Sequence, residues 1–263
     1  MTKTRSILSP YEIDLYDEEK KFGIEFNGNY WHSEQKGISR RYHQKKSLYA
    51  EEKGIFLYHI WEYEWNDPLL KDIILSQIQN IADKNRVKFY ARRCEIRLTS
   101  STDSKLFLTQ NHLQGYCSSK VNLGLYHENE LVSLMTFGKP RFNKNYEWEL
   151  LRFCTKKNTS IIGGASKLFK KFVELYKPKS VLSYSRIDKG TGRLYENLGF
   201  KLDKITDPDY VWTNGKIVLS RYQCQKHKLI QQGFKGSSES EIMENRNFLR
   251  VFGCGNKVWV WNF

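Results

Sequence analysis

The order of apolar and polar positions in the first 90 residues predicts a small α/β unit. An alternating run, an acidic turn and a second strand-like run predict a β-hairpin. Amphipathic stretches on either side of a continuous apolar run predict two helices that flank a buried strand. The expected elements are strands at 11–16, 22–26 and 55–61 and helices at about 39–53 and from Asp67-Pro68 onward. This succession is typical of a mixed α/β domain, and the basic run at 84–93 marks its expected end.

From Cys94 onward the pattern starts again and predicts a second, α+β domain. Antiparallel strands come first, and an alternation of helix and strand closes the domain. The expected elements are helices near 104–114, 164–176 and 190–198 and strands at 121–127, 130–138, 146–154, 179–185, 200–205 and 210–221. Past Gln232 a Gly/Ser-rich linker leads to a hydrophobic end, in which Gly255-Asn256 predicts a hairpin turn. We therefore expect domains at 1–90 and 94–232 and a tail at 233–263.

Charge changes the picture once it is located along the chain. The 263 residues carry 43 Lys and Arg against 29 Asp and Glu, a net charge of +14. Residues 1–90 hold 14 of each sign, so the whole excess lies beyond residue 90, where aromatic side chains are interleaved with basic ones. Such a surface neutralises phosphates and stacks on bases, which favours double-stranded DNA as the partner. The alternative is a solvated basic surface that serves solubility.

Composition argues against several other classes. Hydrophobic residues make up 40% and charged residues 27% of the chain, and the mean hydropathy is −0.64, which fits neither a disordered polymer nor a membrane protein. No stretch approaches the roughly 20 apolar residues of a transmembrane helix, and the N-terminus lacks the apolar core of a signal peptide. Five widely spaced cysteines fit neither a disulfide framework nor a zinc site. We expect a cytoplasmic protein with no membrane partner.

Two carboxylates of the expected hairpin indicate a metal site. Asp14 lies on the first strand and Glu25 on the second, and carboxylates on adjacent strands can converge on one divalent cation. Asn27 shares a strand face with Glu25 and would stand beside a metal-bound water. Mg²⁺ or Mn²⁺ suits such hard oxygen ligands. Taken alone, an acidic hairpin is also typical of a solvated surface.

The arrangement resembles the PD-(D/E)XK nucleases, with Asn27 in place of the usual lysine. The string NGNYWHSE, with Asp14 thirteen residues before Asn27, is similar to the very-short-patch-repair branch of that superfamily. The segment 42–65 is similar to free-standing phage endonucleases. The resemblance covers about residues 7–80. It implies a Mg²⁺-dependent DNA endonuclease of phage or mobile-element (homing-type) origin.

This resemblance also implies a set of site residues. Asp14 and Glu25 would bind the metal, and His32 or His43 would move protons while water attacks the scissile phosphate. The implied DNA contacts are two aromatic side chains that wedge into the base stack and one lysine near a phosphate: Tyr30, Trp31 and Lys46. The structural alternatives are core aromatics, half-buried histidines and an exposed lysine.

The beginning of the chain departs from the nuclease pattern. Relatives carry a helix before the hairpin, often with an acidic residue that completes the site, whereas only about ten residues precede the hairpin here. Three explanations stay open: the acid is dispensable, a second chain supplies the missing N-terminal helix, or the nuclease domain is impaired.

A second resemblance covers about residues 96–222. Gly163-Gly164 begins an amphipathic helix after a strand, where backbone N–H groups can receive a phosphate or pyrophosphate, and RLYENLGFKL follows about thirty residues later. Together these segments resemble the GCN5-related N-acetyltransferase (GNAT) fold. In that family the coenzyme A (CoA) pyrophosphate sits over such a glycine turn, and the last helix commonly reads YExxGF. The family pattern R/Q-x-x-G-x-G/A fits at Gly163 and Ala165 but has Ser160 in its first position.

We therefore expect an α/β protein with an N-terminal PD-(D/E)XK-like mixed-sheet nuclease domain and a C-terminal acetyltransferase-like α+β domain that grips DNA. The main interpretation is a DNA endonuclease, located in the host cytoplasm if it is phage-encoded. Two alternatives stay open. One is an acetyltransferase-fold enzyme that modifies DNA with an acyl cofactor, and the other is a catalytically silent DNA-binding protein.

Overall fold

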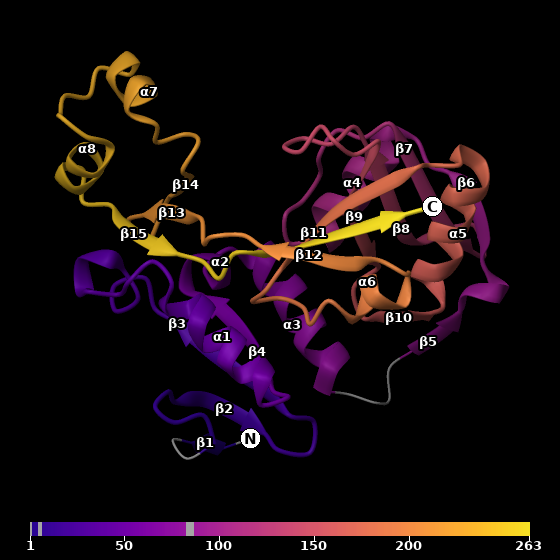
Figure 1. Cartoon of the computed structure of the whole chain (residues 1–263), viewed down its shortest axis with the longest axis horizontal. Coiled ribbons are helices and arrows are strands. Elements are labelled where there is room, and N and C mark those ends of the chain that lie inside the picture. Colours follow the sequence, from indigo (N-terminus) through magenta and orange to yellow (C-terminus); the bar gives the residue numbers. More distant parts are fainter. Residues whose placement is uncertain (1, 5–6, 83–86) are drawn as a thin grey trace. The chain divides into compact units, whose positions relative to one another are not determined.

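The computed structural model describes residues 2–4, 7–82 and 87–263 (Figure 1). The chain divides into two compact units, and each unit is assembled from segments that lie far apart in the sequence. Unit 1 contains Met1–Asp67, Arg186–Thr191 and Ile205–Asn256, and unit 2 contains Pro68–Ser185, Gly192–Lys204 and Lys257–Phe263. These units describe packing, and the domain ranges expected from the sequence stay a prediction.

Unit 1 contains a four-stranded sheet, a three-stranded sheet and several short helices. The strand orders are β1-β2-β3-β4 and β14-β13-β15. The strands are β1 (Thr2–Thr4), β2 (Ile13–Asp17), β3 (Phe22–Asn27), β4 (Phe56–Trp61), β13 (Tyr210–Thr213), β14 (Val218–Ser220) and β15 (Leu249–Phe252). The helices are η1 (Glu34–Lys36), α1 (Tyr42–Glu52), α2 (Glu62–Trp65), α7 (Lys226–Gln231) and α8 (Glu239–Asn245).

The larger sheet of unit 1 confirms the expected N-terminal pattern. Strands β2 and β3 form an antiparallel hairpin, and β3 pairs in parallel with β4, so that Glu25 stands opposite His59 and Asn27 opposite Trp61. A parallel pair needs a crossover connection, and the segment that contains α1 supplies it. Ala50 of α1 packs into a cluster with apolar residues of β2 and β4. The crossover therefore holds one face of α1 against this sheet.

Unit 2 is built on a seven-stranded sheet of order β12-β16-β11-β9-β8-β7-β6, beside a parallel two-stranded pair of β10 and β5. The strands are β5 (Val87–Tyr90), β6 (Glu95–Leu98), β7 (Val121–His127), β8 (Glu130–Gly138), β9 (Trp148–Thr155), β10 (Thr159–Ile162), β11 (Ser180–Arg186), β12 (Lys201–Ile205) and β16 (Asn256–Asn262). The helices are α3 (Pro68–Ala82), η2 (Ala91–Arg93), α4 (Ser101–Asn111), α5 (Gly164–Tyr176) and α6 (Arg193–Asn197).

The centre of this sheet changes from antiparallel to parallel pairing. Strands β6, β7, β8 and β9 pair antiparallel in sequence order, whereas β11 pairs in parallel with β9 and only as far as Leu150 opposite Ser183. The amphipathic helix α5 covers the sheet, and its Phe172 stacks on Phe137 of β8 at a ring-centroid distance of 3.5 Å. Beyond Leu150, the edge of β9 that faces β11 is therefore free of that partner.

The C-terminal segment differs from the expected hairpin. Strand β15 pairs with β13 in the small sheet of unit 1, whereas β16 lies in the large sheet of unit 2. The turn at Gly255-Asn256 therefore passes the chain from one sheet to another instead of closing a hairpin. Trp259 of β16 accounts for a glycine in unit 2, because a Cβ atom on Gly192 (φ +90°) would lie 2.3 Å from its ring.

The protein thus has a mixed α/β fold. Three elements match their expected bounds, namely β7, β8 and α5. The expected strand at 210–221 is instead a hairpin of β13 and β14, which the turn at Asn214-Gly215 joins. In the part of the chain that the structure describes, no helix is both long enough and apolar enough to cross a bilayer.

Candidate functional site

Most of the predicted site residues of unit 1 gather where α1 packs on the sheet. His43, Lys46 and Ser47 lie three and four positions apart, so they share one face of the helix, and all three are buried. This face meets the C-terminal ends of β3 and β4, which carry Glu25, Asn27 and His59. The structure thus brings the predicted residues Glu25, Asn27, His43 and Lys46 together, and their roles stay a prediction.

A buried ion pair occupies the position of the predicted metal site. The Lys46 ammonium pairs with the Glu25 carboxylate, and both side chains are less than a tenth exposed. Burial raises the pKa of Glu25 above its ordinary value, against the opposing charge of Lys46. Asp14 accepts a hydrogen bond from the backbone N–H of Phe26 at 2.8 Å. The Lys46 ammonium therefore faces a carboxylate, which differs from the predicted phosphate contact.

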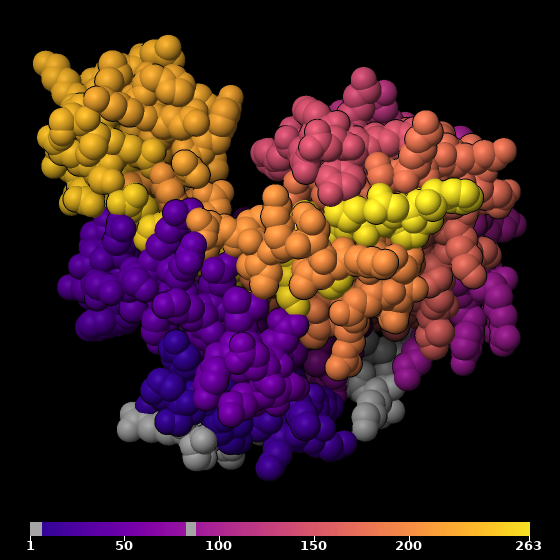
Figure 2. All heavy atoms as spheres, viewed as in Figure 1, coloured from indigo at the N-terminus to yellow at the C-terminus, as the bar shows by residue number. Residues whose placement is uncertain are grey.

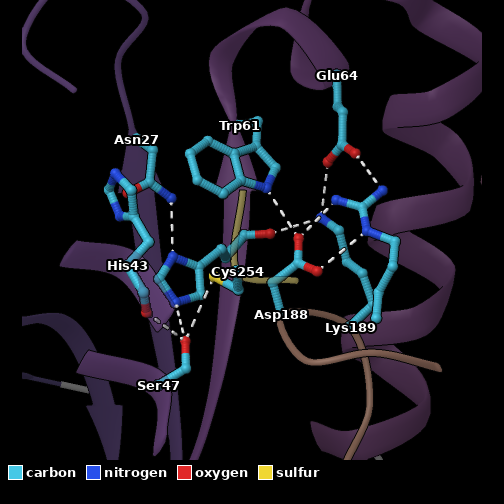
Figure 3. Close-up of polar contacts among 10 residues, drawn as sticks. Asn27, His43, Ser47, Trp61, Glu64, Asp188, Lys189 and Cys254 are labelled. Carbon is cyan, nitrogen blue, oxygen red and sulfur yellow. Dashed lines mark hydrogen bonds and ion pairs between the residues drawn. The ribbon is translucent and has the colours of Figure 1, made fainter. Parts of the chain in front are cut away.

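A second polar chain runs through the interior of unit 1 (Figure 3). The Asn27 side-chain amide is 3.0 Å from Nδ1 of His59, and Nε2 of His59 is 2.8 Å from the Ser47 hydroxyl. That hydroxyl donates to the backbone carbonyl of His43. The order Ser, His, Asn has the connectivity of a hydrolase triad, but His59 is fully buried and burial lowers its pKa to about 3. His59 is thus a core histidine, which fits its position in the apolar strand β4.

The two histidines predicted to move protons face one another. The rings of His32 and His43 are 5.1 Å apart. Burial lowers the pKa of both, and burial together with the neighbouring His59 lowers that of His43 to about 2. Both rings are therefore neutral near pH 7 and carry no charge that would attract a phosphate.

Several buried polar atoms around these histidines lack a hydrogen-bond partner among the described residues. Buried polar groups are nearly always paired, so such a concentration in one place calls for an explanation, such as ordered water or a ligand. The atoms are Oε2 of Glu25, Oδ1 of Asn27, Nδ2 and Oδ1 of Asn29, Nδ1 of His32, and Nδ1 and Nε2 of His43.

The two predicted base-stacking aromatics lie at the surface of the same unit. Trp31 is 71% exposed and Tyr30 is 47% exposed, so neither is a core residue. Their rings meet edge to face at 5.0 Å, and the Lys36 ammonium lies 4.2 Å from the centre of the Tyr30 ring. The structure thus leaves Trp31 accessible to a base, and its contact with DNA stays a prediction.

Sequence reasoning missed a buried charge network beside this cluster. Glu64 of α2 receives the Arg186 guanidinium and the Lys189 ammonium, and both Arg186 and the Trp61 indole donate to Asp188 (Figure 3). Burial alone would raise the pKa of Asp188, but the charges of Arg186 and Lys189 lower it below its usual range. The only signal in the sequence was the charge alternation RIDK after a predicted strand. Nothing in it indicated that the partner is an acid 120 residues earlier.

Unit 2 contains a cavity of about 310 Å³ at the first turn of α5. Its wall includes Phe153 and Thr155, which follow the last β9 residue paired with β11, together with residues of β10, α5 and α6. Helix α5 begins after Gly163 (φ +77°), and no side chain caps it. The first backbone N–H groups of a helix have no intrahelical acceptor and carry the positive end of its dipole. The cavity therefore offers free N–H donors to an anion.

Tyr195, on the cavity-lining helix α6, is half-buried and contacts β11. The Tyr195 hydroxyl is 3.2 Å from Oγ of Ser183 and its ring stacks on Trp259. Burial raises the pKa of Tyr195, so the hydroxyl keeps its proton at neutral pH. The segment YENLGF, which begins at Tyr195, indicates the fold family in the sequence, but the position of the hydroxyl could not be derived from it.

The solved structures similar to this chain include three bacterial acetyltransferases. One is a GNAT family acetyltransferase from Elizabethkingia anophelis with acetyl-CoA bound (12% identity, TM-score 0.38, 65% of this chain and 99% of that chain). Another is a Bacillus subtilis acetyltransferase in complex with CoA (10%, 0.38, 65% and 99%). The third is a spermidine/spermine N-acetyltransferase from Vibrio cholerae in complex with manganese ions (10%, 0.38, 65% and 94%). No known family and no curated protein matches the sequence.

The C-terminal part of the chain thus has acetyltransferase-like structural neighbours, as its sequence predicts. The prediction of a DNA endonuclease is wrong, because these neighbours are acetyltransferases and those from E. anophelis and B. subtilis hold acetyl-CoA or CoA. The predicted Mg²⁺ or Mn²⁺ is also wrong. Within residues 2–4, 7–82 and 87–263 no group of three or more His, Cys, Asp or Glu could hold a metal ion, and the charge of Lys46 already balances Glu25.

Proposed function

We propose that the protein is an acetyltransferase-fold enzyme that binds a CoA thioester in the cavity of unit 2 and acylates a nucleic acid. The observation that carries the proposal is that the cavity joins the uncapped start of α5 to the part of β9 that lies beyond its pairing with β11. Helix N-termini bind phosphate groups. Ligands of sheets with parallel strands also bind where the parallel strands end.

Each part of the cavity suits a different part of such a cofactor. The N–H groups at Gly164, Ala165 and Ser166 would receive the pyrophosphate. The free edge of β9 beyond Leu150 would pair with an extended chain that carries amide groups, as a strand pairs with a peptide. A cofactor that contains both a pyrophosphate and an amide-bearing arm, namely CoA, therefore fits the described donors better than a nucleotide alone.

The chain also offers a proton donor for the transfer step. An amine of the acceptor attacks the thioester carbonyl, the C–S bond breaks, and the acyl group passes to nitrogen. The departing thiolate takes up one proton while the attacking amine loses one. We assign that role to Tyr195 of the cavity-lining helix α6, because its hydroxyl is protonated and is held between Ser183 and the backbone carbonyl of Tyr184.

Charge supports nucleic acid as the acceptor. All of the net charge of +14 lies beyond residue 90, and exocyclic amino groups of bases supply the amines. Double-stranded DNA stays the proposed partner, with Trp31 as an exposed stacking residue. The PD-(D/E)XK-like fold of the N-terminal part, a phage or mobile-element origin, a cytoplasmic location and a second chain that supplies an N-terminal helix are also kept as proposals.

Incubation of DNA with acetyl-CoA, followed by mass spectrometry of the digested nucleosides, tests the proposal. We expect a nucleoside heavier by one acetyl group with the wild-type protein. The Tyr195→Phe variant, which keeps the ring that stacks on Trp259 but lacks the hydroxyl, should form it at least about tenfold more slowly. Unmodified nucleosides under conditions in which both DNA and acetyl-CoA bind would overturn the proposal.

A further inference from the structure

One exposed segment of unit 1 is rich in basic side chains. It comprises residues 214–235, which contain the turn of the β13–β14 hairpin, strand β14 and helix α7, and we name it the cationic surface. This segment has five basic side chains and no acidic one. The basic residues are Lys216, Arg221, Lys226, Lys228 and Lys235.

A small core holds the cationic surface in place. Trp212, Cys224 and Leu229 pack with apolar residues of α8 and with Phe248. The hairpin turn is also fixed, because the Asn214 side chain accepts hydrogen bonds from the backbone N–H groups of Lys216 and Ile217. Lys216 therefore projects from a defined turn and not from a loose loop.

Helix α8, whose apolar residues pack against this segment, also carries acidic residues, and two of them are engaged there. Glu239 accepts hydrogen bonds from the Tyr210 hydroxyl and the Trp212 indole. Glu241 accepts hydrogen bonds from the backbone and hydroxyl of Ser237. Both carboxylates therefore accept hydrogen bonds from groups outside residues 214–235, and Glu241 also attracts the Lys226 ammonium electrostatically.

The cations and one aromatic ring of this surface are open to solvent. Lys216, Lys226 and Lys235 are exposed, and none of them has an ion pair with a described residue. Tyr222 is 69% exposed, and Lys228 holds it through an ammonium over the ring and a hydrogen bond to its carbonyl. Figure 2 shows orange and gold atoms of the region around residues 214–235 at the surface of the viewed face.

We infer that the cationic surface binds the phosphodiester backbone of a nucleic acid. Exposed lysines that form no ion pair neutralise phosphates and release their counterions, and an exposed tyrosine stacks on a base. A surface that served only solubility would need neither the fixed turn nor the held aromatic ring. The inference deepens the nucleic-acid part of the proposed function, but it concerns binding and is independent of acyl transfer.

The test compares two triple variants of the full-length protein that lose the same charge. Lys216, Lys226 and Lys235 are changed to Gln in one variant, and the control variant has Lys21→Gln, Lys45→Gln and Lys53→Gln, all exposed residues elsewhere in unit 1. Fluorescence anisotropy measures the affinity for a duplex and for a single-stranded oligonucleotide between low and physiological salt. Neither variant changes the cavity of unit 2, so acetyl-CoA binding reports separately on the proposed function.

We expect the cationic-surface variant to lose at least about tenfold in affinity, and its log–log salt slope should fall by up to about 0.9 per lysine on duplex DNA. The control should lose much less. Tyr222→Ala should weaken single-strand binding more than Tyr222→Phe, because only Phe keeps a stacking ring. Equal losses in the two triple variants, or equally tight wild-type binding to anionic lipid vesicles, would overturn the inference.

Discussion

The two units of this protein place their polar groups under opposite conditions. In unit 1 the histidines, Glu25 and Lys46 are buried against one another. In unit 2 the cavity is lined by uncharged residues, and its donors include backbone N–H groups at the start of α5. The unit with more reactive side chains thus offers fewer of them to a ligand. The reactive residue types of unit 1 thus mark a polar interior, whereas the backbone groups at the start of α5 carry the proposed cofactor site.

The largest effect is expected from breaking the buried charge network of unit 1. Asp188→Asn leaves Arg186 and Lys189 with one carboxylate fewer, so the variant should lose about 3–5 kcal/mol in the free energy of unfolding. Asp207→Asn is the matched control, because Asp207 is half-exposed and pairs with exposed Arg41. The control should cost about 0–1 kcal/mol. Denaturant unfolding measures both, and equal losses would mean that the network is not buried in solution.

Mild acid is expected to have a smaller effect on stability, and this effect should differ between the two units. The pKa values of His43 and His59 are lowered to about 2 and about 3. At a pH between these values and the ordinary histidine pKa of about 6.5, only the unfolded chain therefore binds the two protons. The contribution of these two histidines to the free energy of unfolding is therefore fully present above about pH 6.5 and is lost as the pH falls. At pH 5.5 each histidine costs about 1.4 kcal/mol.

Hydrogen exchange followed by mass spectrometry resolves this effect by region. Peptides of β3, β4 and α1 should lose protection between pH 7 and pH 5.5, after correction for the intrinsic exchange rate. Peptides of β7 and β8 in unit 2 should keep theirs, because neither strand contains a fully buried histidine. Asp188 does not contribute in this range, because its pKa is lowered and its stabilisation is lost only below about pH 4. Uniform loss in both units would contradict the contrast.

The smallest effect on stability is expected at the exposed aromatic of unit 1. Trp31→Ala removes a ring that is 71% exposed, so the free energy of unfolding should change by no more than about 0.5 kcal/mol. Single-strand affinity should fall by about 1–3 kcal/mol if a base stacks there. Thermal unfolding and anisotropy measure the two quantities. A large loss of stability with unchanged affinity would make Trp31 a structural residue.

Local pattern predicted much of this architecture, and long-range pairing explains the rest. The bounds of β7, β8 and α5 follow from alternation and from apolar spacing, which are local properties. The partner of β16 does not, because Gly255-Asn256 looks like a hairpin turn whichever sheet receives the next strand. The pairing of Glu64 with Arg186 is likewise set by tertiary packing.

The candidate sites show the same division. The shared helix face of His43 and Lys46 was predictable from their spacing, so the polar cluster was found. The interactions within that cluster were not predictable, because the sequence gives no measure of burial. The sequence predicts an exposed residue or a phosphate contact at Lys46, whereas Lys46 is a buried partner of Glu25. The glycines before α5 indicated an anion site, but only the structure places the end of β9 in the same cavity.

Calorimetric titration with acetyl-CoA tests the central claim most directly, with Ser166→Glu as the variant and Lys170→Glu as its control. Ser166 lines the cavity in the first turn of α5, whereas Lys170 is exposed one turn further along. A glutamate in the first turn favours the helix but repels a pyrophosphate. We predict saturable binding by the wild type and the control and at least about tenfold weaker binding by Ser166→Glu, with no loss of thermal stability. Absence of binding by the folded wild type, or equal affinities for all three proteins, would contradict the account.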